Sequence, residues 1–251
     1  MKGIDIHAHL CFPNTYEDVD DVVKTIQKEM TAVIASSARY EEGLDVLRLA
    51  EKYPGVVFVS LGYHPFEGNN PEKTKKLILE NKDRIVSVGE VGLDYHWEQN
   101  SEKREKQKVL FREFLELAKK INKPVVIHSW DAERECFEIA REYEIPLIFH
   151  CFTGSVELAK EIVDAGFYVS ISTNICFSKK LKKVAKVVPM EFMLLETDAP
   201  FLDPDRDRKK NVPWNIKLSA EKIAEVKEMT AEEVLEQTTK NAIKVFGLNI
   251  G

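Results

Sequence analysis

Short apolar, β-branched segments alternate with amphipathic segments along the whole chain. Eight of the apolar segments are too continuously hydrophobic to be half-exposed strands, and this is typical of parallel strands covered by helices. The pattern therefore predicts strands near residues 3–7, 31–36, 55–61, 84–91, 124–128, 146–150, 166–171 and 192–197.

Between these segments, apolar residues recur at helical spacing. The clearest case is 101–121, where Val109, Leu110, Phe114 and Leu117 fall on one stripe. The same spacing predicts helices over 19–30, 41–52, 71–81, 131–142, 155–165 and 179–187, with Asp131 and Ser155 as N-caps of two of them. Two further helices are expected within 216–251, the second beginning after a Thr230 cap.

Eight strand–helix units in about 200 residues predict an α/β fold, a (β/α)8 TIM-type barrel with extra C-terminal helices. No linker, repeat or low-complexity tract interrupts the pattern, so residues 1–251 are expected to form a single domain. A doubly wound open sheet is the competing topology. The Gly-x-Gly-x-x-Gly motif typical of that fold is missing from the sequence.

Composition excludes some partners and locations. The 251 residues carry a formal net charge of −6, which argues against broad attraction to nucleic acid but allows a local basic patch. No apolar run approaches the roughly 20 residues that span a bilayer, and the N-terminus lacks a signal-peptide pattern. Four widely scattered cysteines are expected to be free thiols. We therefore expect a cytoplasmic protein with no membrane partner.

Histidines and carboxylates stand at the ends of five predicted strands. His7 and His9 lie two residues apart, so on a strand both imidazoles point to the same side. A lone histidine of this kind is more often a satisfied core residue than a ligand. Five such strand ends are harder to explain by packing, because cores disfavour unpaired ionisable groups. The other strand ends carry His128, His150, Glu90 and Asp198, and together these side chains predict a metal site at the mouth of the barrel.

Six short motifs occur in order along the chain: HAH (7–9), GYHP (62–65), GEVGLDY (89–95), PVVIH (124–128), HCFTGS (150–155) and LETDAP (195–200). With them the chain resembles the TatD-type deoxyribonucleases, a family of metal-dependent hydrolases within the amidohydrolase-like barrels. The resemblance covers essentially the whole chain. It implies a TIM-type barrel, two divalent metal ions per chain (Zn, Mn or Mg), and hydrolysis of phosphodiester bonds in DNA or a related nucleotide substrate.

The resemblance also implies a set of metal ligands. His7 and His9 would hold one ion with Asp198 as a further ligand, His128 and His150 would hold the other, and Glu90 would bridge the two. Two ions about 3.5–4 Å apart can clamp the attacking and leaving oxygens of an in-line displacement.

The same resemblance implies catalytic roles for Asp198, Glu90 and His64. Asp198 would orient a water or take its proton, and His64 would bind phosphate or help the leaving group. Each has a structural alternative. Glu90 is alternatively part of a salt bridge inside the barrel, Asp198 the N-cap of a helix starting near Pro200, and His64 a partner in a structural hydrogen bond. Glu196 either fixes a ligand by a hydrogen bond or is paired inside the barrel.

Charged and aromatic residues follow several predicted strands. Lysines 179, 180, 182 and 183, with Arg206, Arg208, Lys209 and Lys210, are candidates for a basic lip, or simply for a solvated surface. The aromatic residues Phe12, Trp97, Trp130 and Phe177 are candidates for stacking on unpaired bases, or for packing of loops onto the barrel. His96 is a rim residue with no role assigned.

Three functions are compatible with the sequence. The leading hypothesis is a two-metal phosphodiesterase, a 3′-to-5′ DNA exonuclease, because a single-stranded end fits a barrel mouth better than a continuous duplex does. The second is a two-metal hydrolase of a carbonyl ester or amide such as an aminoacyl ester. Glu90 on the fourth strand, where a carboxylated lysine would stand in many of those enzymes, favours the phosphoester. The third is a non-catalytic metal-binding scaffold. The sequence does not assign an oligomeric state.

Overall fold

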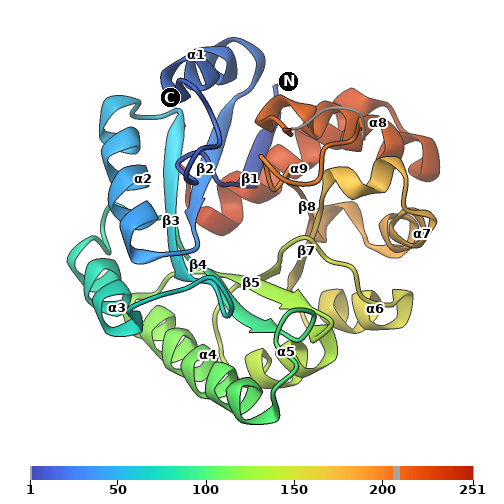
Figure 1. Ribbon diagram of the computed structural model, residues 1–251. Helices are drawn as coiled ribbons and strands as arrows, with labels where there is room; N and C mark the ends of the chain where they lie inside the picture. The colour runs from blue at the N-terminus through green and yellow to red at the C-terminus, as the bar shows by residue number, and fades with distance from the viewer. Residues whose placement is uncertain (1, 206–209, 251) are drawn as a thin grey trace.

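The computed structural model describes residues 2–205 and 210–250, and within them eight parallel strands follow one another around a nearly closed barrel (Figure 1). The order in the sheet is the order in the chain, so each helix returns the chain to the start of the next strand. The TIM-barrel prediction is confirmed. The strands are β1 (Ile4–Ala8), β2 (Ala32–Ser37), β3 (Val57–Tyr63), β4 (Ser87–Asp94), β5 (Val125–Trp130), β6 (Leu147–Phe149), β7 (Tyr168–Ile171) and β8 (Met193–Leu195).

Helices surround the strands and bury their apolar faces against them (Figure 1). The α-helices are α1 (Val19–Glu29), α2 (Tyr40–Lys52), α3 (Pro71–Glu80), α4 (Ser101–Ile121), α5 (Glu133–Ala140), α6 (Val156–Asp164), α7 (Lys179–Val187), α8 (Ile216–Lys227) and α9 (Ala231–Phe246). Short 3-10 helices are η1 (Thr173–Cys176), η2 (Met190–Phe192) and η3 (Pro213–Asn215).

Two of the three named N-caps are confirmed. Ser155 accepts a hydrogen bond from the Leu158 amide, and Thr230 forms a reciprocal capping box with Glu233. The prediction for Asp131 is wrong, because α5 begins two residues later and Asp131 has a φ of 55° instead of the extended backbone of an N-cap. Its carboxylate contacts His96 instead.

The barrel is closed between β1 and the segment that follows β8. Ala8 and Ala199 form an isolated parallel bridge, the His9 amide donates to the Ala199 carbonyl at 2.7 Å, and the Asp198 amide donates to the His7 carbonyl at 3.0 Å. The buried Asp5 carboxylate strengthens this seam by accepting from the backbone amides of His7 and Thr197. The seam therefore places two strand-end histidines and one strand-end aspartate side by side.

Two apolar clusters support this arrangement. The larger one lies between the strands and the surrounding helices. The smaller one joins strand residues such as Ile6 and Ile34 to Phe246 at the end of α9 and to Leu248, so α9 contributes to the core next to β1 and β8. Among the described residues no helix is both long and apolar enough to cross a bilayer. The cytoplasmic location stays a prediction.

Candidate metal centre

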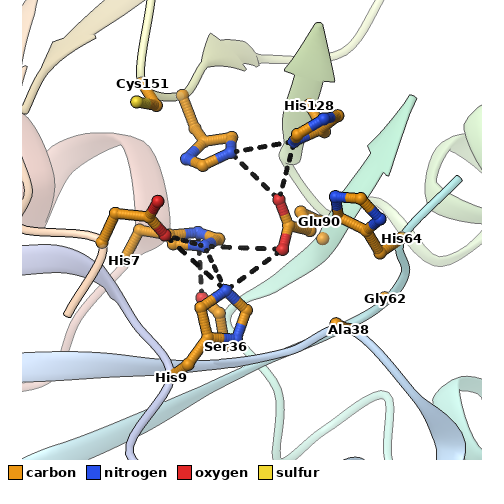
Figure 2. A network of polar contacts seen from close by, with 12 residues as sticks. His7, His9, Ser36, Ala38, Gly62, His64, Glu90, His128 and Cys151 are labelled. Carbon is orange, nitrogen blue, oxygen red and sulfur yellow. Dashed lines mark hydrogen bonds and ion pairs between the residues drawn. The ribbon is translucent and has the colours of Figure 1, made fainter. Parts of the chain in front are cut away.

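The predicted site residues meet at the carboxyl ends of the strands, around a cavity of about 690 Å³ (Figure 2). They come from β1 and the residue after it, from β4 and β5, and from the segments after β3, β6 and β8. Six of them line the cavity, and the completely buried His7 lies against them. The six are His9, His64, Glu90, His128, His150 and Asp198. The structure thus brings together every residue that the sequence nominated as a metal ligand or catalytic residue.

Glu90 lies at the centre of the cluster. Its Oε1 is 3.2 Å from His9 Nε2 and 3.8 Å from His7 Nε2. Its Oε2 is 3.2 Å from His128 Nδ1 and 3.0 Å from His150 Nε2 (Figure 2). Within the described residues its ion-pair partners are all histidines, with no lysine or arginine, so the salt-bridge alternative has no cationic partner other than imidazole. Each carboxylate oxygen faces a separate pair of imidazoles.

The spacing of the imidazole nitrogens fits cation binding. His7 Nε2 and His9 Nε2 are 3.2 Å apart, and His150 Nε2 and His128 Nδ1 are 3.4 Å apart. Two nitrogen donors on one tetrahedral zinc ion, each at about 2.0–2.1 Å from the metal, lie roughly 3.3 Å apart. Asp198 Oδ1 is 3.6–3.7 Å from the first pair. Both pairs therefore have the separation of two ligands of a single ion.

Polar side chains behind the first histidine pair hold its rings. Ser36 Oγ is 3.1 Å from His7 Nδ1, and Glu42 Oε1 is 3.1 Å from His9 Nδ1. A carboxylate at the pH of the cell only accepts, so His9 carries its proton on Nδ1. Its Nε2 is directed toward Glu90 and Asp198 and is the atom that would lose its proton when a cation binds, as in metal-binding histidines generally.

In the second histidine pair, His128 has a hydrogen-bond partner behind its ring, and His150 has a carboxylate at ion-pair distance. Asp94 Oδ2 is 3.1 Å from His128 Nε2, and Glu196 Oε1 is 3.4 Å from His150 Nδ1. Glu196 also accepts a hydrogen bond from the backbone amide of Cys151. Its position behind His150 corresponds to the alternative in which it orients a ligand.

Three of these supporting residues were not assigned a role in the sequence analysis. Ser36 and Asp94 are polar residues at the carboxyl ends of apolar strands. The same position in the sequence pattern identified the histidines, and it could have identified these two residues. Glu42 belongs to the buried face of α2, where Val46 and Leu49 follow at helical spacing. A carboxylate on a buried helical stripe is uncommon and could have been recognised as a buried partner.

Burial and neighbouring charges shift the pKa values of the cluster in opposite directions. Burial alone would lower the pKa of His9, but Glu42 and Glu90 outweigh it and hold that pKa well above the usual value. Burial would raise the pKa of Glu90, but His64, His150 and His128 hold it well below its usual range. Burial raises the pKa of Asp198 to about 6, although His150 and His9 act against this rise.

His64 differs from the other four histidines of the cluster. Its Nδ1 accepts hydrogen bonds from the backbone amides of Phe66 at 3.1 Å and Glu67 at 3.0 Å. Burial, with a smaller effect from His128, lowers its pKa to about 3, so the ring is neutral. Its proton is therefore on Nε2, which becomes a donor. Although His64, Asp94 and His128 are close enough to form a further metal-binding group, His64 has no free lone pair to offer.

Asp198 does not cap a helix, so this alternative is wrong. Its φ is 57°, and its carbonyl accepts from the Phe201 amide, which turns the chain instead of starting a helix. The turn directs the half-buried carboxylate toward His7 and His9. The buried Asn211 holds the following loop by donating to the carbonyls of Thr197 and Leu202.

The structure places some of the predicted rim residues at the cavity and others away from it. The Lys210 ammonium donates to the carbonyls of Asn14 and Thr15, and the Lys180 ammonium donates to the Thr153 carbonyl. The remaining predicted lip residues of the 205–210 loop, Arg206, Arg208 and Lys209, lie outside the described residues. Of the four candidate aromatic residues, Phe12, Trp97 and Trp130 line the cavity, while Phe177 borders an adjoining groove.

A TIM barrel whose strand ends gather histidines and carboxylates into one cavity defines a metal-binding barrel protein. The model of the family described as TatD related DNase matches residues 4–247. The chain therefore belongs to the TatD family of metal-dependent hydrolases, which confirms the family resemblance and, at that level, the prediction of a hydrolase acting on ester bonds.

Individual relatives agree with this assignment. The chain is 38% identical to an uncharacterized metal-dependent hydrolase of Methanocaldococcus jannaschii, over 98% of this chain and 97% of the relative. It is 37% identical to the human protein named Deoxyribonuclease TATDN3, over 97% of this chain and 94% of the relative. The crystal structure of the TatD homologue YJJV from Escherichia coli K12 superposes with a TM-score of 0.88 at 25% identity, covering 98% of both chains.

Proposed function

We propose that the chain is a deoxyribonuclease that removes nucleotides from single-stranded DNA ends in the 3′-to-5′ direction with two divalent cations (Zn, Mn or Mg). The main support is the placement of Glu90, whose two carboxylate oxygens face two separate histidine pairs. A carboxylate so placed can serve two cations at once. The name of the human relative supports DNA as the substrate. In this proposal residues 1–251 form one hydrolase domain.

The ligand assignment follows the two sides of Glu90. On one side His7, His9 and Asp198 would hold the first cation, and on the other side His128 and His150 would hold the second. When bound, divalent cations supply the positive charge that activates water and stabilises charge developing on a phosphate. The protein contributes fixed ring orientations, because each of the four imidazoles already has its second nitrogen next to Ser36, Glu42, Asp94 or Glu196.

Asp198 and His64 have different tasks in this proposal. Asp198 lines the cavity, and only one of its oxygens contacts His7 and His9, so the other is available to orient a water or accept its proton. His64 keeps its proton on Nε2, as its backbone hydrogen bonds require, and donates it to a phosphate oxygen or to the leaving group. We expect His64→Ala to lower kcat at least 10-fold with unchanged metal content. A loss of metal without a change in kcat per bound metal would contradict this role.

The direct test uses single-stranded oligonucleotides labelled at either end. The wild-type chain should release nucleotides from the 3′ end, lose this activity in EDTA, and recover it with Mg²⁺, Mn²⁺ or Zn²⁺. A blunt duplex of the same sequence serves as the matched substrate and should react more slowly. A metal-restored protein without phosphodiesterase activity on any nucleic acid would refute the proposal. Activity on aminoacyl esters in the same assay would favour the carbonyl-ester alternative, and no turnover of either substrate would favour the scaffold.

A further inference from the structure

Three large aromatic side chains are exposed along one wall of the cavity. The exposed fractions are 48% for Phe66, 58% for Trp97 and 41% for Trp130, and all three line the cavity that contains the metal-site residues. They follow β3 and β4 or end β5, so three neighbouring strands present them side by side. Phe137 and Phe149, by comparison, are fully packed in the core.

The exposed rings contact one another in a continuous wall. The Phe66 and Trp97 ring centres are 6.3 Å apart, and those of Trp97 and Trp130 are 6.1 Å apart. His96 stacks on Trp130 with a centre distance of 4.0 Å and an interplanar angle of 7°. The parallel His96–Trp130 pair shows that this edge of the cavity already supports flat ring stacking.

The wall is fixed relative to the metal site. Asp94 accepts from the Trp97 backbone amide at 2.8 Å with Oδ1, and its Oδ2 lies 3.1 Å from His128 Nε2. Arg104 holds the same loop through the carbonyls of Tyr95 and Glu98. A single carboxylate therefore positions both a proposed metal ligand and the backbone of the residue that carries an aromatic ring.

The described lining of the cavity offers a nucleotide exposed aromatic rings and no cationic side chain. Among the described residues that line the cavity, none is lysine or arginine, whereas Glu67 and Asp203 are acidic. Neighbouring phosphates of a strand thus find no cationic side chain among these described lining residues. Every base, however, has a π-face that can stack on tryptophan or phenylalanine.

We propose that Phe66, Trp97 and Trp130 form a stacking subsite for the unpaired nucleobase adjacent to the scissile phosphate. This inference rests on the proposed function and adds the residues that recognise the base. It favours a base free of its partner strand, since a base inside a duplex is stacked on both faces by its neighbours. Phe201, on another part of the cavity, packs edge-on against His9 and is not part of this subsite.

The test measures kcat and KM on oligonucleotides carrying a single abasic residue at successive positions from the 3′ end. For the wild type we expect one position at which base removal raises KM about 10-fold, within the range that stacking on one aromatic ring produces. Trp97→Ala should raise KM similarly on the intact oligonucleotide, with little further effect of the abasic residue at that position. Trp97→Phe should restore much of the affinity. Leu79→Ala, which removes a 39% exposed apolar side chain away from the cavity, is the matched control.

A second measurement separates this inference from the nuclease proposal. Binding of deoxyadenosine 5′-monophosphate to the metal-loaded protein should quench tryptophan fluorescence, and deoxyribose 5-phosphate should not. An inactive wild type that still distinguishes the two ligands would refute nuclease activity but support the subsite. An active Trp97→Ala variant with wild-type KM and an unchanged abasic profile would overturn the subsite alone. A wild-type dimer that Trp97→Ala converts to a monomer would also overturn it, by assigning the wall to a second copy of the chain.

Discussion

Replacing Glu42 with glutamine tests whether a side chain outside the ligand set controls metal binding. Glu42 is 4% exposed, and each of its oxygens has a partner: Oε1 lies 3.1 Å from His9 Nδ1, and Oε2 accepts from the Ala38 amide at 2.7 Å. Glutamine has nearly the same shape, but only one of its two terminal atoms accepts hydrogen bonds. If the amide oxygen keeps the Ala38 contact, the amide NH2 group faces His9 Nδ1. The proton of His9 is then favoured on Nε2, the atom that must bind the metal.

The size of the effect follows from this change of tautomer. Loss of a partner behind a metal-binding histidine costs about 10- to 100-fold in metal affinity, which corresponds to about 1.4–2.8 kcal/mol. If the glutamine turns the other way, the Ala38 amide faces a donor and stays unsatisfied, which costs about 1–3 kcal/mol of stability. The first orientation therefore lowers metal affinity, and the second lowers the stability of the fold.

The assay is a calorimetric titration of metal-free Glu42→Gln with Mn²⁺ or Zn²⁺, run below the melting temperature of the variant. Circular dichroism shows whether the metal-free chain is folded. Glu41→Gln is the matched control, because this exposed neighbour on α2 accepts a hydrogen bond from Asn69 instead of facing a metal-site histidine, and the variant should bind metal as the wild type does. A folded Glu42→Gln variant with wild-type affinity for both ions would show that the tautomer of His9 is not set by this contact.

Three further predictions concern the metal cluster and its support. His128→Ala should lower occupancy of the second metal with little loss of fold, and full metal content by elemental analysis would remove His128 from the ligand set. Gly62→Ala would place a Cβ 2.3 Å from the Glu90 carbonyl oxygen, so unfolding in urea should show a loss of about 1–3 kcal/mol together with weaker metal binding. Gly55→Ala, with open space around it, should leave metal binding unchanged. Metal at about 100 times its Kd should stabilise the fold by about 2.7 kcal/mol, and a Tm that does not depend on EDTA would contradict the site.

Local pattern was sufficient for the architecture and for the location of the chemistry. Continuous apolar runs separated by amphipathic segments specify parallel strands with helical cover, and polar residues at the strand ends mark the active face. His128 and His150 stand out because an ionisable side chain interrupts an apolar run. The same local reasoning failed at Asp131, where contact with His96 and a left-handed backbone override its preference for capping.

The supporting contacts could not be predicted because they join residues far apart in the chain. Glu42 and His9 are 33 residues apart, and Asp94 and His128 are 34 residues apart. A single sequence shows that each of these residues is polar in an apolar context, but it does not show which ring nitrogen faces which carboxylate. The tautomer of His64 depends in the same way on two backbone amides whose direction is set by a turn.

The sequence by itself determined the order of strands and helices, the residue types at the strand ends and the family, because these depend on hydrophobic periodicity and on motifs within a few residues. Only the tertiary structure decided that the two oxygens of Glu90 divide four histidines into two pairs, and that exposed tryptophans stand beside them. The physical reason is that barrel closure sets distances of 3–4 Å between side chains from different strands, and such distances depend on the packing of the whole chain.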